Sequence, residues 1–256
     1  MRLRSKTVAG VLCAVLTLIP HCLAAADQPS IEAEADSLLK KMSDYLAALD
    51  GFTILAESTQ EELLDSGQKL MFTLQSQMTV KRPNKFHASR KGMIRDQEII
   101  YDGKHLVLHG KTVKLFARVP APATIDEAFT FATETLGLTA PGGDLIYSDP
   151  YSGLMADALE GYYIGPTIVA GKACHHLAYR NAEVDWQIWI QDGDKPLPQK
   201  YVITSKWLTA APQYTLTFLK WDTATAVSDD KFQFNAPEGA AEIEFLKMQS
   251  TEEDAK

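Results

Sequence analysis

Three consecutive residues, Cys174, His175 and His176, are the most reactive group of side chains that the sequence places together. On a strand, Cys174 and His176 would share one face and His175 would point to the other. A cysteine and a histidine could supply two metal ligands, but a structural zinc site needs four protein ligands and a catalytic site three. A Cys–His nucleophile would also need an oriented base and an oxyanion site. A metal-dependent or Cys/His enzyme centred on Cys174–His176 is therefore one hypothesis, and ordinary packing in a sheet is the favoured one.

Other catalytic and cofactor patterns are missing from the sequence or fail in their spacing. Asp192-Gly193-Asp194 lacks the remaining ligands of a calcium loop and is typical of a turn. Gly110-Lys111-Thr112 has His105 where a phosphate-binding loop requires glycine. No G-x-S-x-G or H-E-x-x-H motif occurs. We therefore expect no enzymatic activity, no cofactor and no metal site.

The reactive group lies inside a stretch that predicts three antiparallel strands, at 173–180, 184–191 and 199–207. Short polar turns rich in Asn, Gly and Pro separate them, as in a meander. In the middle strand, Trp186 and Ile188 alternate with polar residues, so one face of this strand is apolar. We expect that face to be turned towards the interior.

The first 26 residues have the three parts of a secretory signal peptide. Arg2, Arg4 and Lys6 precede a short apolar run, and a small-residue cleavage site ends near Ala26. The run is too short to span a bilayer comfortably, so we expect export to the periplasm as a soluble protein that is not an integral membrane protein. The expected organisation is a signal peptide over 1–26, one domain over 27–250 and a frayed tail over 251–256.

Charge and cysteine content narrow the partners and the means of stabilisation. The formal net charge is −8, and loss of the signal peptide removes three basic residues and no acidic one, so the mature chain is more acidic still. This acidity argues against nucleic acid and anionic membrane surfaces as partners. Cys13 and Cys22 leave with the signal peptide, so Cys174 remains without an intramolecular disulfide partner. The fold must be stabilised by its apolar core.

The remaining chain predicts a mainly β domain with few helices. Ser30 should cap a first helix over 31–49, and about eleven strands follow in antiparallel sequence. A helical insertion over about 124–160 interrupts them, with Thr124 capping its first helix. Strands with one apolar face need a cover, so we expect one curved sheet whose concave face is covered by helices, an arrangement that tends to leave a cavity.

The order of elements resembles the LolA/LolB superfamily of periplasmic lipoprotein carriers. The segments C-H-H-L-A-Y-R (174–180), V-D-W-Q-I-W-I (184–190) and P-L-P-x-K (196–200) resemble, more closely, a family of predicted periplasmic proteins of unknown function within that superfamily. The resemblance implies a LolA-like unclosed β-barrel that carries or senses a hydrophobic ligand. It also implies an arginine that latches a lid helix, for which Arg82, Arg90 and Arg95 are candidates.

The favoured function is a non-covalent carrier or sensor whose ligand is a lipid, an acyl chain or a lipoprotein, with an envelope protein as a further possible partner. A structural or partner-binding protein with a packed barrel is the main alternative. The wall and lid of the expected cavity are assigned from the polarity of each face alone. The wall residues are Leu70, Phe72, Leu74, Met78, Trp186 and Ile188, and the lid residues are Phe129, Leu136, Leu154 and Met155.

Overall fold

The structure is a computed structural model that describes residues 29–138 and 140–245. The expected signal peptide and the C-terminal tail lie outside the described residues. The helical insertion expected at about 124–160 falls within them except for residue 139, and its described part contains four short helical segments between Ile125 and Met155, after β7 (Leu115–Pro120) and before β8 (Glu160–Val169).

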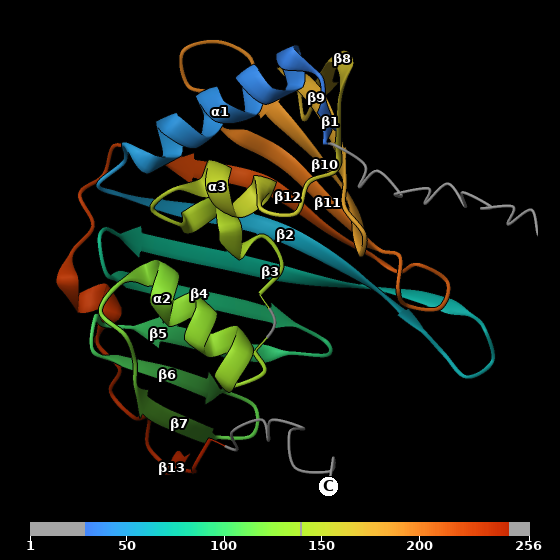
Figure 1. The fold of residues 1–256 in the computed structure, drawn as a ribbon. Helices are drawn as coiled ribbons and strands as arrows, with labels where there is room; N and C mark the ends of the chain where they lie inside the picture. The colour runs from blue at the N-terminus through green and yellow to red at the C-terminus, as the bar shows by residue number, and fades with distance from the viewer. Residues whose placement is uncertain (1–28, 139, 246–256) are drawn as a thin grey trace, which may run out of the picture.

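All strands of the described chain belong to one open, strongly twisted sheet (Figure 1). Its order is β1-β8-β9-β10-β11-β12-β2-β3-β4-β5-β6-β7-β13, and neighbours are antiparallel except for β1 with β8 and β13 with β7. Eleven of these strands have six or more residues, which confirms the expected unclosed antiparallel sheet. The bounds are β1 (Ser30–Ile31), β2 (Gly51–Leu63), β3 (Lys69–Lys81), β4 (Lys85–Gly92), β5 (Asp96–Tyr101), β6 (His105–Gly110), β7 (Leu115–Pro120), β8 (Glu160–Val169), β9 (Lys172–Arg180), β10 (Val184–Gln191), β11 (Pro198–Ser205), β12 (Gln213–Asp222) and β13 (Ala241–Glu242).

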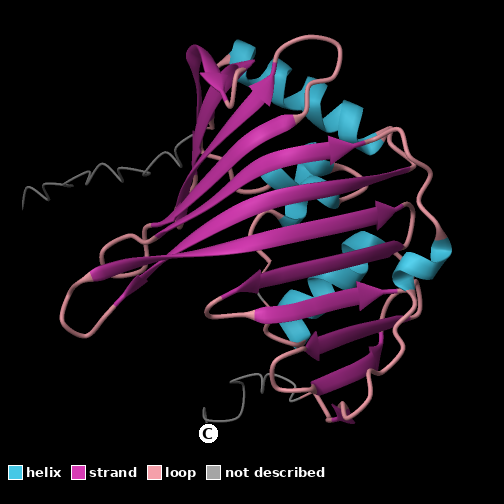
Figure 2. Cartoon of the chain, turned by 180° about the vertical axis from the view of Figure 1, so that it is seen from behind, coloured by secondary structure: helices cyan, strands magenta, loops and turns pink. Residues whose placement is uncertain are grey.

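The main helices lie together on one face of this sheet. Figure 2 views the molecule from the opposite side and shows the strands in front of α1, α2 and α3. The face covered by the helices is called here the inner face. A cover on one face was expected for a sheet with one apolar side. The bounds are α1 (Ala33–Ala47), α2 (Ile125–Thr130), the π-helical turn η1 (Phe131–Thr135), the 3-10 turn η2 (Gly143–Ile146), α3 (Pro150–Met155) and the 3-10 turn η3 (Asp229–Phe232).

The two predicted helix caps had different outcomes. Thr124 does cap α2, since its hydroxyl accepts from the backbone N–H of Glu127 at 3.2 Å. The prediction that Ser30 caps the first helix was wrong: Ser30 pairs in parallel with Glu160 as part of β1, and α1 begins at Ala33. Pairing with β8 holds residues 30 and 31 in an extended conformation, so the helix begins only after this pairing ends.

The half of the sheet formed by β8 to β11, called here the helix-packed half, is covered by α1. The apolar stripe of α1 is fully buried and packs towards β8, β9 and β10. Tyr179 stacks on Trp186 with ring centres 4.2 Å apart, and its hydroxyl donates to the backbone oxygen of Ala35 at 2.9 Å. Burial of each such large apolar side chain contributes roughly 1.5–3 kcal/mol, so α1 and this half form a solid core.

The other half, β12 together with β2 to β7, is called here the pocket half and is covered by α2, η1 and η2 (Figure 1). Phe129 of α2 lies against Phe86 of β4, with ring centres 5.1 Å apart, and against Tyr147, at 5.9 Å. The carboxylate of Asp126 accepts from the backbone N–H of Ser148 at 2.9 Å, which ties α2 to the segment after η2. The cover is thus a set of short turns held by a few contacts.

Candidate functional site

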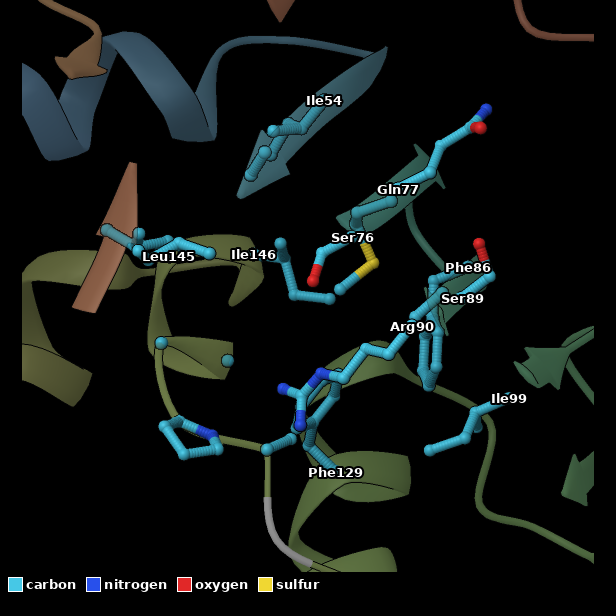
Figure 3. A pocket seen from close by; sticks show the side chains of 18 of the residues that line it. Ile54, Ser76, Gln77, Phe86, Ser89, Arg90, Ile99, Phe129, Leu145 and Ile146 are labelled. Atoms are coloured by element: carbon cyan, nitrogen blue, oxygen red, sulfur yellow. The ribbon is translucent and has the colours of Figure 1, made fainter. Parts of the chain in front are cut away.

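A pocket of about 100 Å³ lies between the pocket half of the sheet and its cover (Figure 3). Its floor comes from residues of β12, β2, β3, β4 and β5, most of them inward-facing, and its roof from α2, η1, η2 and residues 138 and 140–142. Most of its lining is apolar. The side chains that form its apolar part are Ile54, Ala56, Met78, Phe86, Ala88, Ile99, Phe129, Ala132, Leu138, Leu145, Ile146, Leu216 and Phe218.

Small residues explain why a space remains here. Ala56 and Ala88 lie on the floor, and Ala132, Gly142 and Gly143 lie in the roof. A Cβ at Gly143 would collide with the ring of Phe129, so a side chain there would force this ring to move. Folded interiors are otherwise packed at crystal density, so a group of Ala and Gly on both walls leaves unfilled volume.

One end of the pocket is polar. Arg90 follows Phe86 and Ala88 at two-residue spacing along β4, so all three side chains face inward. Its neighbours across the strands are Ser76 on β3 and Gln97 on β5. The guanidinium carbon lies 5.9 Å from the ring centre of Tyr214, a cation–π distance. The pocket therefore has an apolar body and one cationic end.

Arg82 fastens the cover to the sheet. Its Nη1 donates to the backbone oxygen of Ile146 in η2 at 3.0 Å, and its Nη2 donates to that of Leu46 in α1 at 3.5 Å. Burial lowers the pKa of Arg82, and the nearby charge of Asp126 partly offsets this. Of the three latch candidates, Arg82 contacts two of the elements that cover the sheet, α1 and η2. Arg90 lines the pocket, and Arg95 lies in the turn between β4 and β5.

On the outer face behind the pocket, Glu98 gathers three cationic or protonatable groups. Its carboxylate lies 3.0 Å from Nε2 of His87, 2.9 Å from Nδ1 of His109 and 2.9 Å from Nζ of Lys111. The hydrogen bond from His87, with those from His109 and Lys111, lowers the pKa of Glu98 far below its ordinary value although burial opposes the shift. This cluster, which we call the Glu98 cluster, joins β4, β5 and β6.

The structure divides the predicted wall residues between three places. Met78 lines the pocket. Trp186 and Ile188 are buried in the helix-packed half, away from the pocket lining. The other three, Leu70, Phe72 and Leu74, share the inward-facing parity of Met78 but lie farther along the β2–β3 hairpin, where their partners on β2 are Glu62, Gln60 and Ser58.

The predicted lid residues also separate. Phe129 lines the pocket, while Leu136 and Leu154 are buried in the core and Met155 is half-buried against it. Of the ten predicted residues, the pocket brings Met78 and Phe129 together. Leu154 and Met155 belong to α3, which packs against α1 and η2.

Sequence reasoning missed the parts of the wall contributed by β4, β5 and β12. These strands carry Phe86, Ala88 and Ile99, together with Leu216 and Phe218. A usable signal was present in β4, because alternation places a charged residue, Arg90, on the same face as Phe86 and Ala88. An arginine on an otherwise apolar face marks a functional position more strongly than another leucine does.

The Cys174 group is arranged as part of the sheet. Cys174 is buried, and burial raises the pKa of its thiol, which leaves less of the reactive thiolate. His176 pairs with Oε1 of Gln187 at 3.0 Å and stacks on Trp189, while His175, on the other face, contacts Tyr163 and Asp192. Within residues 29–138 and 140–245, no group of three His, Cys, Asp or Glu side chains is placed to hold a metal ion.

Several solved structures are similar to this chain at low sequence identity. An uncharacterized conserved protein from Thermus thermophilus matches over 82% of this chain and 99% of its own, at 10% identity and a TM-score of 0.50. LprF from Mycobacterium bovis matches over 83% and 100%, at 12% identity and a TM-score of 0.46. A LolA superfamily protein from Nitrosomonas europaea matches over 78% and 97%, at 12% identity and a TM-score of 0.41.

No curated protein sequence matches the chain at a significant level. In the part of the chain that the structure describes, no helix has the length and apolarity needed to cross a bilayer. One family model matches residues 35–246, and its description is "Predicted periplasmic protein (DUF2092)". The match spans most of the chain, including the whole pocket and its cover, and the chain therefore belongs to this DUF2092 family of predicted periplasmic proteins.

Proposed function

We propose that this protein is exported to the periplasm, with its signal peptide cleaved near Ala26, and that it carries or senses a lipid, acyl chain or similar hydrophobic ligand without forming a covalent bond to it. The observation that carries the proposal is the apolar pocket enclosed between the sheet and a cover of short turns. The family description supports the compartment. The likeness to LolA-type carriers is a likeness of fold and supports the architecture in which such a pocket occurs.

The energetics suit an acyl chain. Each methylene moved from water into an apolar site contributes about 0.8 kcal/mol, so several methylenes provide useful affinity without directed polar contacts. The apolar body of the pocket offers aromatic and branched walls for such a chain, including Phe86, Phe129 and Phe218. Shape and burial would then select the ligand, with no catalytic group required.

The size of the pocket requires the cover to move when a chain enters. A volume of about 100 Å³ is smaller than the roughly 150 Å³ of an apolar cavity that admits benzene. Gly142, with φ of +82°, is a left-handed position at the start of η2 where the cover can turn. We propose that loosening of the Arg82 contacts to Ile146 and Leu46 opens the pocket, as the latch arginine of LolA-type carriers would imply.

The test is native mass spectrometry of the protein purified gently from the periplasm, followed by organic extraction and uptake of added lipid. A bound acyl species supports the proposal if it is lost in Ala88→Leu, which fills the pocket. It should be retained in the matched control Ala173→Leu, which enlarges an exposed alanine on β9.

If the purified protein carries no ligand and takes up none of the added lipid, the carrier proposal is contradicted. That result would favour the alternative of a packed, partner-binding barrel. A bound species that persists in Ala88→Leu would place the binding site elsewhere and would equally contradict the pocket assignment.

A further inference from the structure

Arg90 differs from the other residues of the pocket in its charge. Among the described residues that line the pocket, it is the single basic side chain. Figure 3 shows it extending from its strand into the space beneath the cover. Its strand partners Ser76 and Gln97 add hydrogen-bonding groups at the same end, while Met78 and Leu145 belong to the apolar body.

The guanidinium of Arg90 has no carboxylate partner among the described residues. Its guanidinium lies over the face of the Tyr214 ring, which leaves its N–H donors without an anionic acceptor among the described residues. Glu98 also borders the pocket, but its carboxylate is engaged on the outer face by His87, His109 and Lys111. Glu98 therefore does not neutralise the positive charge of Arg90. Asp96, the other acidic residue that flanks Gln97 on β5, forms no ion pair with Arg90 among the described residues.

Arg82 shows how a partnered arginine is used in this same half. Its guanidinium donates to two backbone oxygens of the cover and carries a structural contact. Arg90 makes no such contact within the described chain. A half-buried cation on an apolar face is costly unless an anion or a hydrogen-bonded partner compensates it.

A guanidinium is also selective for the anions that it binds. Its planar fork of N–H donors matches the paired oxygens of a carboxylate or a phosphate, and such charge-assisted bonds are roughly twice as strong as neutral ones. We propose that the ligand of this pocket is an anionic amphiphile, whose carboxylate or phosphate head binds Arg90 and whose alkyl chain lies along the apolar body. This inference rests on the proposed function and adds the chemical class of the ligand and its orientation.

The experiment compares three ligands with the same alkyl chain, dodecanoate, dodecyl phosphate and dodecanol, by calorimetric titration near neutral pH and below their aggregation concentrations. In the wild-type protein the better anion should bind about tenfold more tightly than the neutral alcohol, as expected for a charge-assisted hydrogen bond. Arg90→Gln should remove this advantage and leave the affinity for dodecanol unchanged. Arg95→Gln, which removes an arginine from the turn after the same strand, should leave all three affinities unchanged.

A further variant and a folding control distinguish loss of anion binding from loss of the fold. Arg90→Lys retains the charge without the fork and should retain part of the preference for the anion, and thermal unfolding of each variant checks that it is folded. The ranking of dodecanoate against dodecyl phosphate identifies which head group Arg90 receives. Equal affinity for dodecanol and both anions in the wild-type protein, or an undiminished preference for the anion in Arg90→Gln, would overturn this inference while leaving the hydrophobic carrier intact. Failure of all three ligands to bind would contradict the carrier proposal itself.

Discussion

The helix-packed half and the pocket half are parts of one sheet, but their inner faces carry side chains of different size. Under α1, the sheet presents the large side chains of Tyr179, Trp186 and Ile188, which are buried in the core. Under α2 and η2, Ala56 and Ala88 face a roof that is itself rich in Ala and Gly. The same architecture thus gives a solid core on one side and a pocket on the other, and side-chain volume decides which.

The comparison also shows that the part of the sequence with the most distinctive pattern is not the part that lines the pocket. The segment from Cys174 to Lys200, on which the resemblance in the sequence rests, forms most of β9, all of β10 and the start of β11 in the helix-packed half. The pocket lies over strands with ordinary alternating patterns, of which β4 is an example. Residues that are distinctive in the sequence can therefore serve packing, as the stacked pair of Tyr179 and Trp186 does.

The largest expected effect is loss of the central aromatic residue of the helix-packed half. Trp186→Ala should lower the free energy of unfolding by roughly 3–5 kcal/mol, because the remaining cavity is enclosed by Tyr179, Tyr201 and α1. Urea unfolding measures this loss. Met78→Ala enlarges an existing pocket and should cost less in stability while it weakens ligand binding. Equal stability losses for the two variants would contradict the distinction between the halves.

An intermediate effect is expected at the Glu98 cluster, which supports the pocket half from outside. Glu98→Gln replaces charge-assisted hydrogen bonds and should cost about 1.5–3 kcal/mol at neutral pH. The folded-state pKa of Glu98 is lowered, so its contribution is present above its unfolded pKa of about 4.3 and is lost as the pH falls further. The difference in unfolding free energy between wild type and variant should therefore shrink on acidification below that value. A constant difference between neutral pH and about pH 3 would contradict the pKa assignment.

The smallest expected effect compares two glycines, one in each half. A Cβ at Gly161 would lie 2.7 Å from the ring of Tyr179, which is held between Trp186 and α1 and cannot yield, so Gly161→Ala should cost roughly 1–3 kcal/mol. A Cβ at Gly143 would meet Phe129, whose ring borders the pocket and can shift into it. Gly143→Ala should therefore cost less and should weaken ligand binding. Thermal unfolding and ligand titration of both variants test this pair, and a larger stability loss for Gly143→Ala would reverse the comparison.

The fold was largely predictable from local patterns. The alternation in β3 and β10, the turns between strands and the cap of α2 at Thr124 each depend on neighbouring residues, and the structure confirms them. The cap expected at Ser30 failed because β1 pairs with β8, a strand that is distant in the chain. Pairing over such a distance leaves no mark on the local pattern.

The site was predictable only in part. The alternation of a strand gave Met78 its inward position and the apolar stripe of a helix gave Phe129 its own, and both residues line the pocket. Polarity does not predict what lies opposite each residue, and Trp186 and Ile188, assigned by the same rule, meet α1 and form a packed core. The small residues that open the pocket come from separate strands and from the roof, and their conjunction exists only after folding.

The sequence by itself determined a mainly β, single-sheet domain with one covered face, because hydrophobic periodicity and turn chemistry are local properties. It also determined that Arg90 shares a face with Phe86 and Ala88, because that follows from alternation alone. Only the tertiary structure decided where the sheet is filled and where it is hollow, and that Arg82 reaches the cover while Arg90 reaches the pocket. The physical reason is that packing depends on the summed volumes of side chains brought together from distant parts of the chain.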